Sequence, residues 1–303
     1  MDDQFFKKFY LTLYARTSGF IPSKPMGQCM YPGDFFQIIN GEMIVLGNIF
    51  RNNIISKDDC EIEYNIDQNA ASWNFSRGIS KPYSVRDSMH DSELQYKYSK
   101  QVIDFKEYGS FYFKSNDVKS VKIADWSNIK NQLIIRMTQI YYSFRELYVV
   151  TESASANDWT LAISGSDKGE LELRIETEKE SSLEIFGQES AKTTQARDIE
   201  YYNHERGRKA NFFKAKKLVV KQDKLETFIS ELIYNQRTHA EWVIDFFDFK
   251  FDAPHYVSSN NIINSQSSIL DMLQANELNP NTALLYFEWA NANSDDIEKL
   301  FIE

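Results

Sequence analysis

The sequence predicts an α+β protein whose body is mostly antiparallel and strand-rich, with several packed helices and a helical C-terminal tail. Aromatic residues make up 15% of the chain, including 22 Phe and 17 Tyr, and their broad side chains pack well on a pleated sheet. Several short segments alternate apolar with polar residues, which is the period of a strand with one solvated face. The end of the chain instead shows helical spacing with capping residues.

The clearest strand signal is a β-hairpin over residues 33–47. Two apolar runs flank Asn40 and Gly41, a pair that tolerates the positive φ angles of a type I′ turn. The prolines that precede it, Pro22, Pro25 and Pro32, cannot donate to a ladder, so we expect an ordered loop that leads into the hairpin.

Further strands are predicted from short, aromatic or β-branched runs, at residues 8–16, 60–66, 110–114, 146–151 and 242–251. The middle of the chain predicts a second hairpin. Trp159, Leu161 and Ile163 alternate with small or polar residues, and after a turn at 165–169 a return strand alternates apolar with charged positions over 170–176.

Helices are predicted where apolar residues recur at helical spacing. Residues 125–144 place Ile129, Leu133 and Met137 on one face. Further helices are expected at 223–235, 268–274, 281–290 and 294–301, with Asn279 and Pro280 as cap and first-turn residue of the segment at 281–290. We therefore divide the chain into a strand-rich body at 1–265, with a sub-boundary near residue 150, and an acidic helical segment at 266–303.

Charge is distributed unevenly. Residues 223–303 hold 14 acidic and 4 basic residues, which accounts for the whole net charge of −10. Such asymmetry accompanies an electrostatic partner or serves as a solubilising surface. No run of about 18 apolar residues occurs, so the sequence predicts no transmembrane helix. Two isolated cysteines, Cys29 and Cys60, predict neither a disulfide framework nor a zinc site, and we expect reduced thiols in a soluble, cytoplasmic protein.

The sequence favours a non-enzymatic protein, because no dinucleotide-binding, phosphate-loop or nucleophile-elbow motif occurs. One enzymatic alternative is a metal-dependent hydrolase. This alternative needs a divalent metal and no organic cofactor. Carboxylates and imidazoles can hold a divalent metal that activates water, and the expected ligands are His239, Asp245, Asp248, Asp252 and His255. The plain structural interpretation of this cluster is acidic residues on the wet face of a strand.

Residues 204–221 contain seven basic residues, among them Arg206, Arg208 and Lys209, interleaved with aromatics. Cations that neutralise phosphates beside rings that stack on bases are used to bind single-stranded nucleic acid, so nucleic-acid binding through 206–221 is one interpretation. Lysines also protect an exposed edge strand from aggregation. In a third interpretation, the acidic segment beyond residue 223 lies against this stretch and masks it.

The leading functional hypothesis is an intracellular interaction protein whose acidic C-terminal part binds a macromolecular partner, expected to be a basic protein. Tyr286, Phe287 and Trp289 lie close together in the predicted helix, and aromatic residues anchor interfaces. The alternative for these three residues is that they dock the tail onto the body.

A further alternative is a pore-forming protein restrained by its C-terminal tail. The alternating region at 159–185, which follows the small residues at 151–156, has the pattern of hairpins that rearrange to cross membranes. An ordinary antiparallel sheet with one solvated face gives the same pattern.

The hydrolase alternative predicts stoichiometric divalent metal in the purified protein, measurable by elemental analysis. The His255→Ala variant should lose the bound metal, because the substitution removes one ligand. A purified chain without metal, and without thermal stabilisation by any divalent ion, would contradict it.

Overall fold

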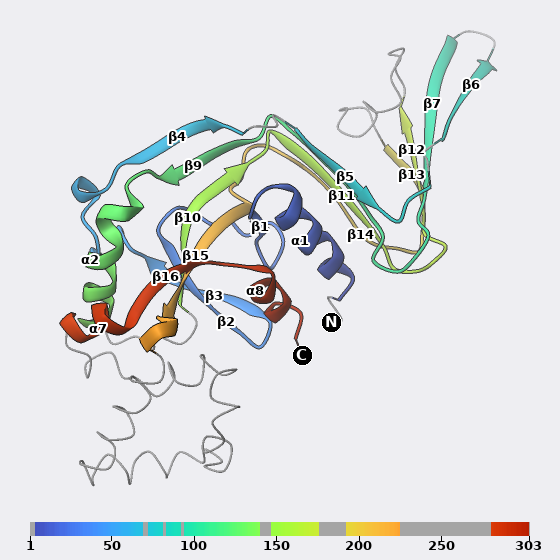
Figure 1. Ribbon diagram of the computed structural model, residues 1–303. Helices are drawn as coiled ribbons and strands as arrows, with labels where there is room; N and C mark the ends of the chain where they lie inside the picture. The colour runs from blue at the N-terminus through green and yellow to red at the C-terminus, as the bar shows by residue number, and fades with distance from the viewer. Residues whose placement is uncertain are drawn as a thin grey trace, which may run out of the picture.

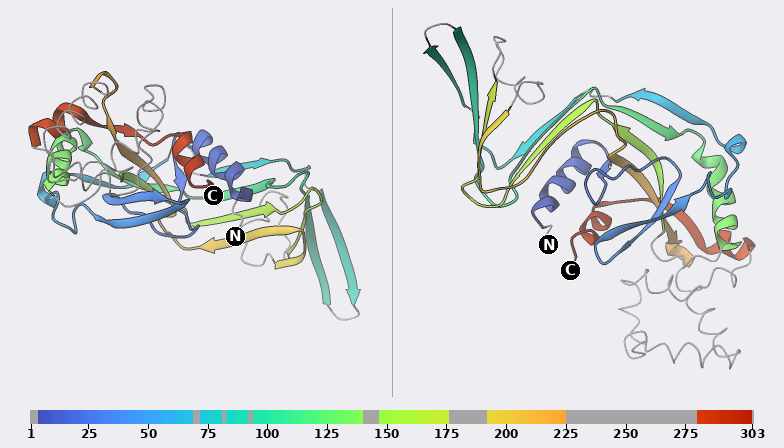
Figure 2. Two further views of the ribbon diagram at one scale, coloured as in Figure 1. Left: turned by 90° about the horizontal axis from the view of Figure 1, so that it is seen from below. Right: turned by 180° about the vertical axis from the view of Figure 1, so that it is seen from behind.

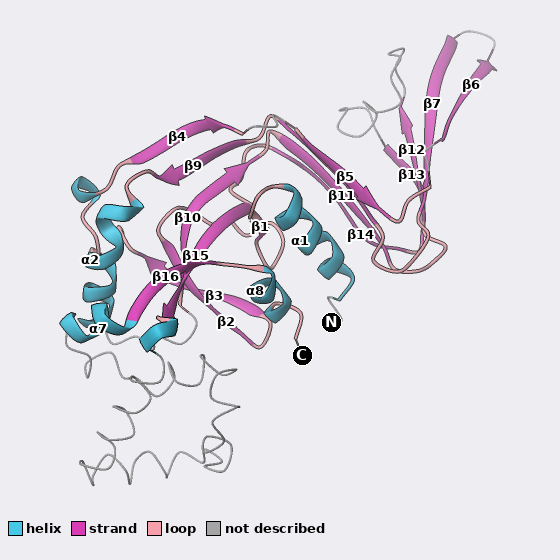
Figure 3. Cartoon of the chain, viewed as in Figure 1, coloured by secondary structure: helices cyan, strands magenta, loops and turns pink. Residues whose placement is uncertain are grey.

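The computed structural model describes residues 4–68, 72–80, 83–91, 94–139, 147–175, 192–224 and 280–302. Within these residues the chain is mostly β, and all strand pairs are antiparallel, as predicted (Figure 1). The described helices are few (Figure 3): α1 (Gln4–Arg16), α2 (Trp126–Gln139), α7 (Pro280–Tyr286) and α8 (Ser294–Lys299), with 3-10 turns η1 (Lys57–Asp59) and η2 (Gln222–Lys224).

The body is built on an eight-stranded sheet with the central order β1-β15-β10-β2-β3. Strand β16 joins it through β15, and β9 pairs with both β10 and β4. Its strands are β1 (Ile21–Pro22), β2 (Asp34–Ile39), β3 (Glu42–Asn48), β4 (Ile62–Asp67), β9 (Lys119–Ile123), β10 (Tyr148–Ser155), β15 (Phe212–Val220) and β16 (Phe287–Asn291).

Two four-stranded sheets extend from the body, one after the other. The first has the order β14-β11-β8-β5 and the second the order β13-β12-β7-β6. Each strand of the first sheet is joined along the chain to the strand at the same place in the second. The strands are β5 (Trp73–Arg77), β6 (Tyr83–Asp91), β7 (Leu94–Asp104), β8 (Phe111–Asn116), β11 (Asp158–Ser164), β12 (Glu170–Ile175), β13 (Lys192–Arg197) and β14 (Ile199–Arg206).

The two sheets together are therefore two long, bent hairpins lying side by side, one over residues 73–116 and one over 158–206. The chain bends sharply between the sheets, so that β6, β7, β12 and β13 form an arm that projects away from the body (Figures 1 and 2). A small core fills the bend, where Ile103, Phe105 and Leu171 pack against Tyr112 and Ala162.

The hairpin predicted at residues 33–47 is confirmed. Strands β2 and β3 pair with Ile39 opposite Glu42, and the turn residues Asn40 and Gly41 have φ angles of 51° and 77°. Both central residues of a type I′ turn need such positive angles. The strands predicted at 60–66, 110–114 and 146–151 correspond to β4, β8 and β10.

The strand predicted at residues 8–16 is wrong, because this segment belongs to α1. Phe5, Phe9, Tyr10 and Leu13 are buried, and they recur at the three- to four-residue spacing of one helix face. Their aromatic character suggested a strand, but the stripe packs under the first small sheet. The Phe9 ring lies 5.5 Å from Phe111 and 5.1 Å from Phe113.

The helix predicted at 125–144 is confirmed over α2, and Ile129, Leu133 and Met137 are buried in the second core of the body. The hairpin predicted at 159–176 is wrong in its pairing. Strand β11 pairs with β8 and β14, and β12 pairs with β7 and β13, so the turn at 165–169 carries the chain from one sheet to the next. Local alternation indicates strands but does not indicate their neighbours.

The C-terminal segment differs in part from the predicted helical tail. The helix predicted at 294–301 is confirmed as α8, whereas the one predicted at 281–290 ends at Tyr286 and the chain continues as strand β16. The helix predicted at 223–235, the strand at 242–251, the helix at 268–274 and the cluster from His239 to His255 lie outside the described residues.

None of the described helices has the length and apolar character needed to cross a bilayer.

The burial of α1 gives a stability prediction. Phe9→Ala should lower the free energy of unfolding by about 3–5 kcal/mol, because it leaves a cavity beside Phe111 and Phe113. The exposed Arg16→Ala, on the same helix, should change it by less than about 0.5 kcal/mol. Denaturant titration of the two variants measures the difference, and equal values would contradict this placement of α1.

Candidate functional site

The strongest candidate site is the surface of the body that binds the C-terminal segment, residues 280–302, which we call the tail. Its centre is β15. One side of β15 pairs with β10, whereas the other pairs first with the short β1, at Phe212 and Phe213, and then with β16. The register with β16 runs from Lys216 opposite Asn291 to Val220 opposite Phe287. The tail therefore supplies the strand that β1 is too short to provide.

Backbone hydrogen bonds continue the pairing beyond both ends of β16. The amide of Lys221 donates to the carbonyl of Tyr286 at 2.8 Å, and the amide of Ala292 donates to the carbonyl of Ala215 at 2.9 Å. A strand edge without such partners leaves donors and acceptors unpaired, which is costly when they are shielded from water.

Asp296 is the polar anchor of the tail. It is 2% exposed, and its Oδ1 accepts hydrogen bonds from the hydroxyl of Tyr148 at 2.8 Å and from Nζ of Lys217 at 2.9 Å. Lys299 lies 3.5 Å from the same oxygen. Oδ2 accepts from the backbone amide of Asn293 at 2.8 Å, which closes a capping box at the start of α8. One carboxylate thus orders α8 and binds it to the large sheet.

Aromatic residues anchor the other end of the tail. Tyr286 and Phe287 are buried at 2% and 1% exposure in the core that also contains α2. Trp289 is half-buried, its ring meets that of Trp126 edge-to-face at 5.5 Å, and its Nε1 donates to the carbonyl of Lys130 at 3.1 Å. These residues dock the tail onto the body, as the alternative to an external interface predicts.

The last described residues lie against α1 and the Asn40–Gly41 turn. Phe301 packs edge-to-face on Tyr10 at 5.1 Å, and the side chains of Gln4 and Lys24 donate to the carbonyls of Phe301 and Leu300. A Cβ on Gly41 would lie 3.1 Å from the carbonyl oxygen of Leu300. The turn therefore needs glycine both for its positive φ and for the close approach of the tail.

Five lysines of the body contact the tail. Two of them, Lys217 with Asp296 and Lys7 with Glu298 at 3.7 Å, form ion pairs. Lys216 donates to Oδ1 of Asn291 at 2.7 Å, Lys221 donates to the carbonyl of Leu284 at 2.7 Å, and Lys24 also lies over the Phe301 ring. Burial, helped by the nearby charge of Lys130, lowers the pKa of Lys216. Three of these lysines belong to the basic stretch at 204–221, so part of that stretch is covered by the tail.

The remaining predicted partner-binding residues form contacts within the body. Arg208 donates to the carboxylate and to the backbone carbonyl of Asp117, and Lys209 forms an ion pair with Glu205. Arg206 donates from Nε to His204 Nε2 at 3.2 Å. The structure does not bring these three residues together with the aromatic residues of the tail.

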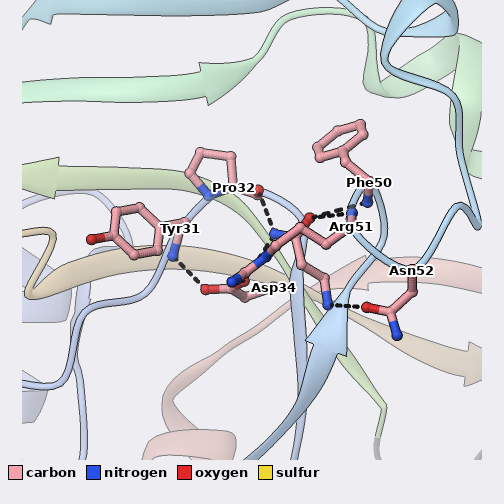
Figure 4. Close-up of polar contacts among 7 residues, drawn as sticks. Tyr31, Pro32, Asp34, Phe50, Arg51 and Asn52 are labelled. Atoms are coloured by element: carbon pink, nitrogen blue, oxygen red, sulfur yellow. Dashed lines mark hydrogen bonds and ion pairs between the residues drawn. The ribbon is translucent and has the colours of Figure 1, made fainter.

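A buried carboxylate also fixes the entrance to the β2–β3 hairpin (Figure 4). Asp34 is 2% exposed and accepts from the backbone amide of Tyr31 at 2.7 Å, from Asn48 Nδ2 at 2.8 Å and from Arg51 Nη2 at 3.0 Å. A hydrogen bond to the Cys29 side chain, with the charge of Cys29 and then burial, raises the pKa of the Tyr31 hydroxyl. This network holds the proline-containing loop against the end of β3.

A groove of about 360 Å³ opens beside this loop, between it and strands β4, β9 and β10. Tyr31 and Tyr64 line it and are 51% and 67% exposed. The hydroxyl of Ser153, also in its lining, is buried without a hydrogen-bond partner. The groove thus presents two tyrosine rings, the hydroxyls of Ser153 and Ser155, and the guanidinium of Arg208, which is already bound to Asp117.

In the part of the chain that the structure describes, no group of three or more His, Cys, Asp or Glu side chains is placed to hold a metal ion. The cluster proposed from the sequence, His239, Asp245, Asp248, Asp252 and His255, lies outside that part, so the metal hypothesis stays a prediction. The sequence matches no protein-family model and no curated protein.

Sequence reasoning missed Asp296, Lys217 and Tyr148 as residues of the candidate site. The signal available for Asp296 was its position three residues after Asn293, which is the spacing of a capping box. No local pattern relates Asp296 to Lys217, because the two are 79 positions apart and meet through sheet pairing.

The anchor role of Asp296 can be tested with its neighbour as control. Asp296→Asn removes the charge that faces Lys217, and losing one partner of a buried ion pair costs about 3–5 kcal/mol. Lys217 keeps 19% exposure, so we expect the lower end, which is about 100-fold faster amide hydrogen exchange across β16. The exposed Asp295→Asn should leave the exchange nearly unchanged. Equal protection in both variants would contradict the anchor role.

Proposed function

We propose that this chain is a pore-forming protein whose C-terminal tail restrains it. The observation that carries this proposal is the arm of β6, β7, β12 and β13, the outer parts of the two long hairpins, which projects from a body whose sheet is completed by the tail. The arm supports a membrane-inserting role, and the tail contacts support a restraint.

The first hairpin has the dimensions of a membrane-crossing element. Strand β6 has 9 residues and β7 has 11. A strand that crosses the hydrocarbon core of a bilayer needs about 9–11 residues. Together β6 and β7 form a hairpin of sufficient length, connected by a short segment at residues 92–93 and projecting from the body (Figure 2, right).

The β6–β7 register separates polar from mostly apolar positions. Because successive residues of a strand belong to opposite faces, one face is formed entirely by polar pairs: Ser84 with Gln101, Arg86 with Ser99, Ser88 with Lys97 and His90 with Gln95. The alternate positions hold Tyr83, Val85, Met89, Leu94, Tyr96, Tyr98 and Val102, together with Asp87, Asp91 and Lys100. Such a two-faced hairpin suits a sheet with lipid on one side and water on the other.

In the observed sheet, the apolar residues of β12 and most apolar residues of β6 and β7 lie on opposite faces. Leu171, Leu173 and Ile175 of β12 pair with Ile103, Gln101 and Ser99 of β7, on the mostly polar face. A one-residue change of register would bring the two apolar sets to the same face. We therefore take the observed arm as a resting arrangement that inserts only after β12 and β7 re-pair.

The tail contacts explain how the resting form is held. The tail covers one edge of β15, packs on α1 through Phe301 and engages five lysines of the body. Its loss would uncover these lysines, and each basic residue near an anionic membrane surface contributes about 1 kcal/mol of attraction. Release of the tail would thus both free the sheet edge and create a basic surface for anionic lipid.

A second candidate is the interaction protein whose acidic C-terminal part binds a basic macromolecule. Glu288, Asp295 and Glu298 support it, because all three are exposed on the tail. Affinity capture from the native cell at low and high salt tests this candidate. A partner lost at high salt and lost with a charge-neutralised E288Q/D295N/E298Q chain would favour it.

Releasing the tail should make the protein permeabilise membranes. A specific protease site inserted at 260–268, a mostly polar stretch between the strand predicted at 242–251 and the helix predicted at 268–274, would allow the tail to be cut from the purified full chain. With Asp296→Asn added to weaken docking, cleavage should cause dye leakage from vesicles that contain anionic lipid, and much less from neutral vesicles. Fluorescence dequenching measures the release.

Two controls define this experiment. The uncut chain should cause no leakage, and the cut chain that carries Asp295→Asn in place of Asp296→Asn should leak less. Anionic vesicles that stay sealed, although the tail has separated from the body on a sizing column, would contradict the pore-forming proposal.

A further inference from the structure

We infer that the edge of β15 is a binding site that recognises the tail even when the tail is not covalently linked to the body. Cutting the chain therefore does not by itself release the tail, and residues 280–302 of a second copy can occupy the same edge. The inference deepens the proposed function and rests on it for the role of the tail as a restraint. It commits to one occupant, the tail sequence itself.

The first argument concerns the contacts that the tail makes with the described part of the body. It pairs through β16, and the polar groups at its helix start are satisfied by the capping box around Asn293 and Asp296. Seven apolar residues of the tail are buried: Ala283, Tyr286, Phe287, Ala292, Ile297, Leu300 and Phe301. Within the described residues, these contacts join the tail to the large sheet, α1 and α2.

The second argument concerns the acceptor, which has recognition features at fixed positions along β15. Lys217 meets the carboxylate of Asp296, and Lys216 meets the amide of Asn291 and lies 5.9 Å from the Trp126 ring. Trp126 receives Trp289. An extended peptide added to a sheet edge gains affinity from backbone hydrogen bonds and specificity from the side chains that alternate along it. The order Phe-Glu-Trp-Ala-Asn followed by a capped acidic helix is therefore the recognised pattern.

The consequence follows from mass action. A covalent link holds the tail near its site at an effective concentration in the millimolar range, and cutting the link removes this advantage but none of the contacts. The cut tail should stay bound at micromolar protein and leave on dilution or competition. A tail from a second copy can then bind the same edge, because exchange of an identical element between protomers reproduces every contact.

The test uses the full chain with the protease site at 260–268 and the native tail sequence. After cleavage at micromolar concentration, the fragment should co-elute with the body from a sizing column. A fluorescently labelled synthetic peptide of residues 280–303 should then exchange into the complex, which fluorescence anisotropy detects. As competitors, the Asp296→Asn peptide should be at least about 10-fold weaker than the unchanged peptide, and the Asp295→Asn peptide should equal it.

Separation of the fragment from the body directly on cleavage, whether the body then stays folded or precipitates, would overturn the inference. Equal competition by the two variant peptides would overturn it as well. These outcomes are distinct from failure of the pore-forming proposal. Peptide-driven exchange with vesicles that stay sealed would contradict pore formation alone, whereas immediate loss of the fragment with vesicle leakage would contradict the acceptor site alone.

Discussion

The open edge of β15 is the constraint on which the rest of the structure depends. Strand β1 pairs with only its first two residues, and positions 216–220 need another strand. The chain meets this need with β16, far along the sequence, and adds the Asp296 carboxylate beside Lys217. Because Phe301 of the same tail packs on α1, and α1 packs on the first small sheet through Phe9, one segment connects the large sheet to the base of the arm.

This arrangement makes the tail both part of the fold and separable from it. Among the described strands, β16 pairs with β15 alone and lies at the edge of the sheet, so its removal leaves the pairing of β15 with β10 intact. It is held by the pairing of β16 with β15, by the Asp296 carboxylate, by lysines of the body and by buried apolar side chains. Edge strands held in this way open at lower free energy than central ones, because fewer contacts are lost at once. The arm is similarly set apart, since β6 and β13 are the outer strands of its sheet.

The sequence was most informative where structure is decided locally. The Asn40–Gly41 turn, α2 and α8 follow from turn chemistry, helical periodicity and capping, and all three were predicted. The aromatic residues of 8–16 favour a strand, but the helical spacing of Phe9, Tyr10 and Leu13, which buries one face, makes the segment a helix. Residues 287–291 carry helix-compatible side chains, and only the distant edge of β15 makes them a strand. Nonlocal pairing of this kind has no signature in a short window.

The candidate site shows the same division. Tyr286, Phe287 and Trp289 were identified from their composition, and the idea that the acidic end lies against the basic stretch agrees with the contacts of Asp296 and Asn291. Lys217 and Tyr148 could not be assigned, because each is one residue among many of its type until the register is known. Of the strands of the arm, only β12 was predicted, as the return strand at 170–176, whereas β6, β7 and β13 were not. The order of the strands across the two sheets depends on contacts between segments far apart in the chain.

A disulfide lock tests the central claim, that a docked tail restrains the protein. Lys216 and Asn291 are direct partners between β15 and β16, and Lys216→Cys with Asn291→Cys in a Cys29→Ser background should form a bond across them. In the chain cut at 260–268 that also carries Asp296→Asn, the oxidised lock should keep anionic vesicles sealed, and reduction should start leakage. Leakage of equal extent before and after reduction would contradict the claim.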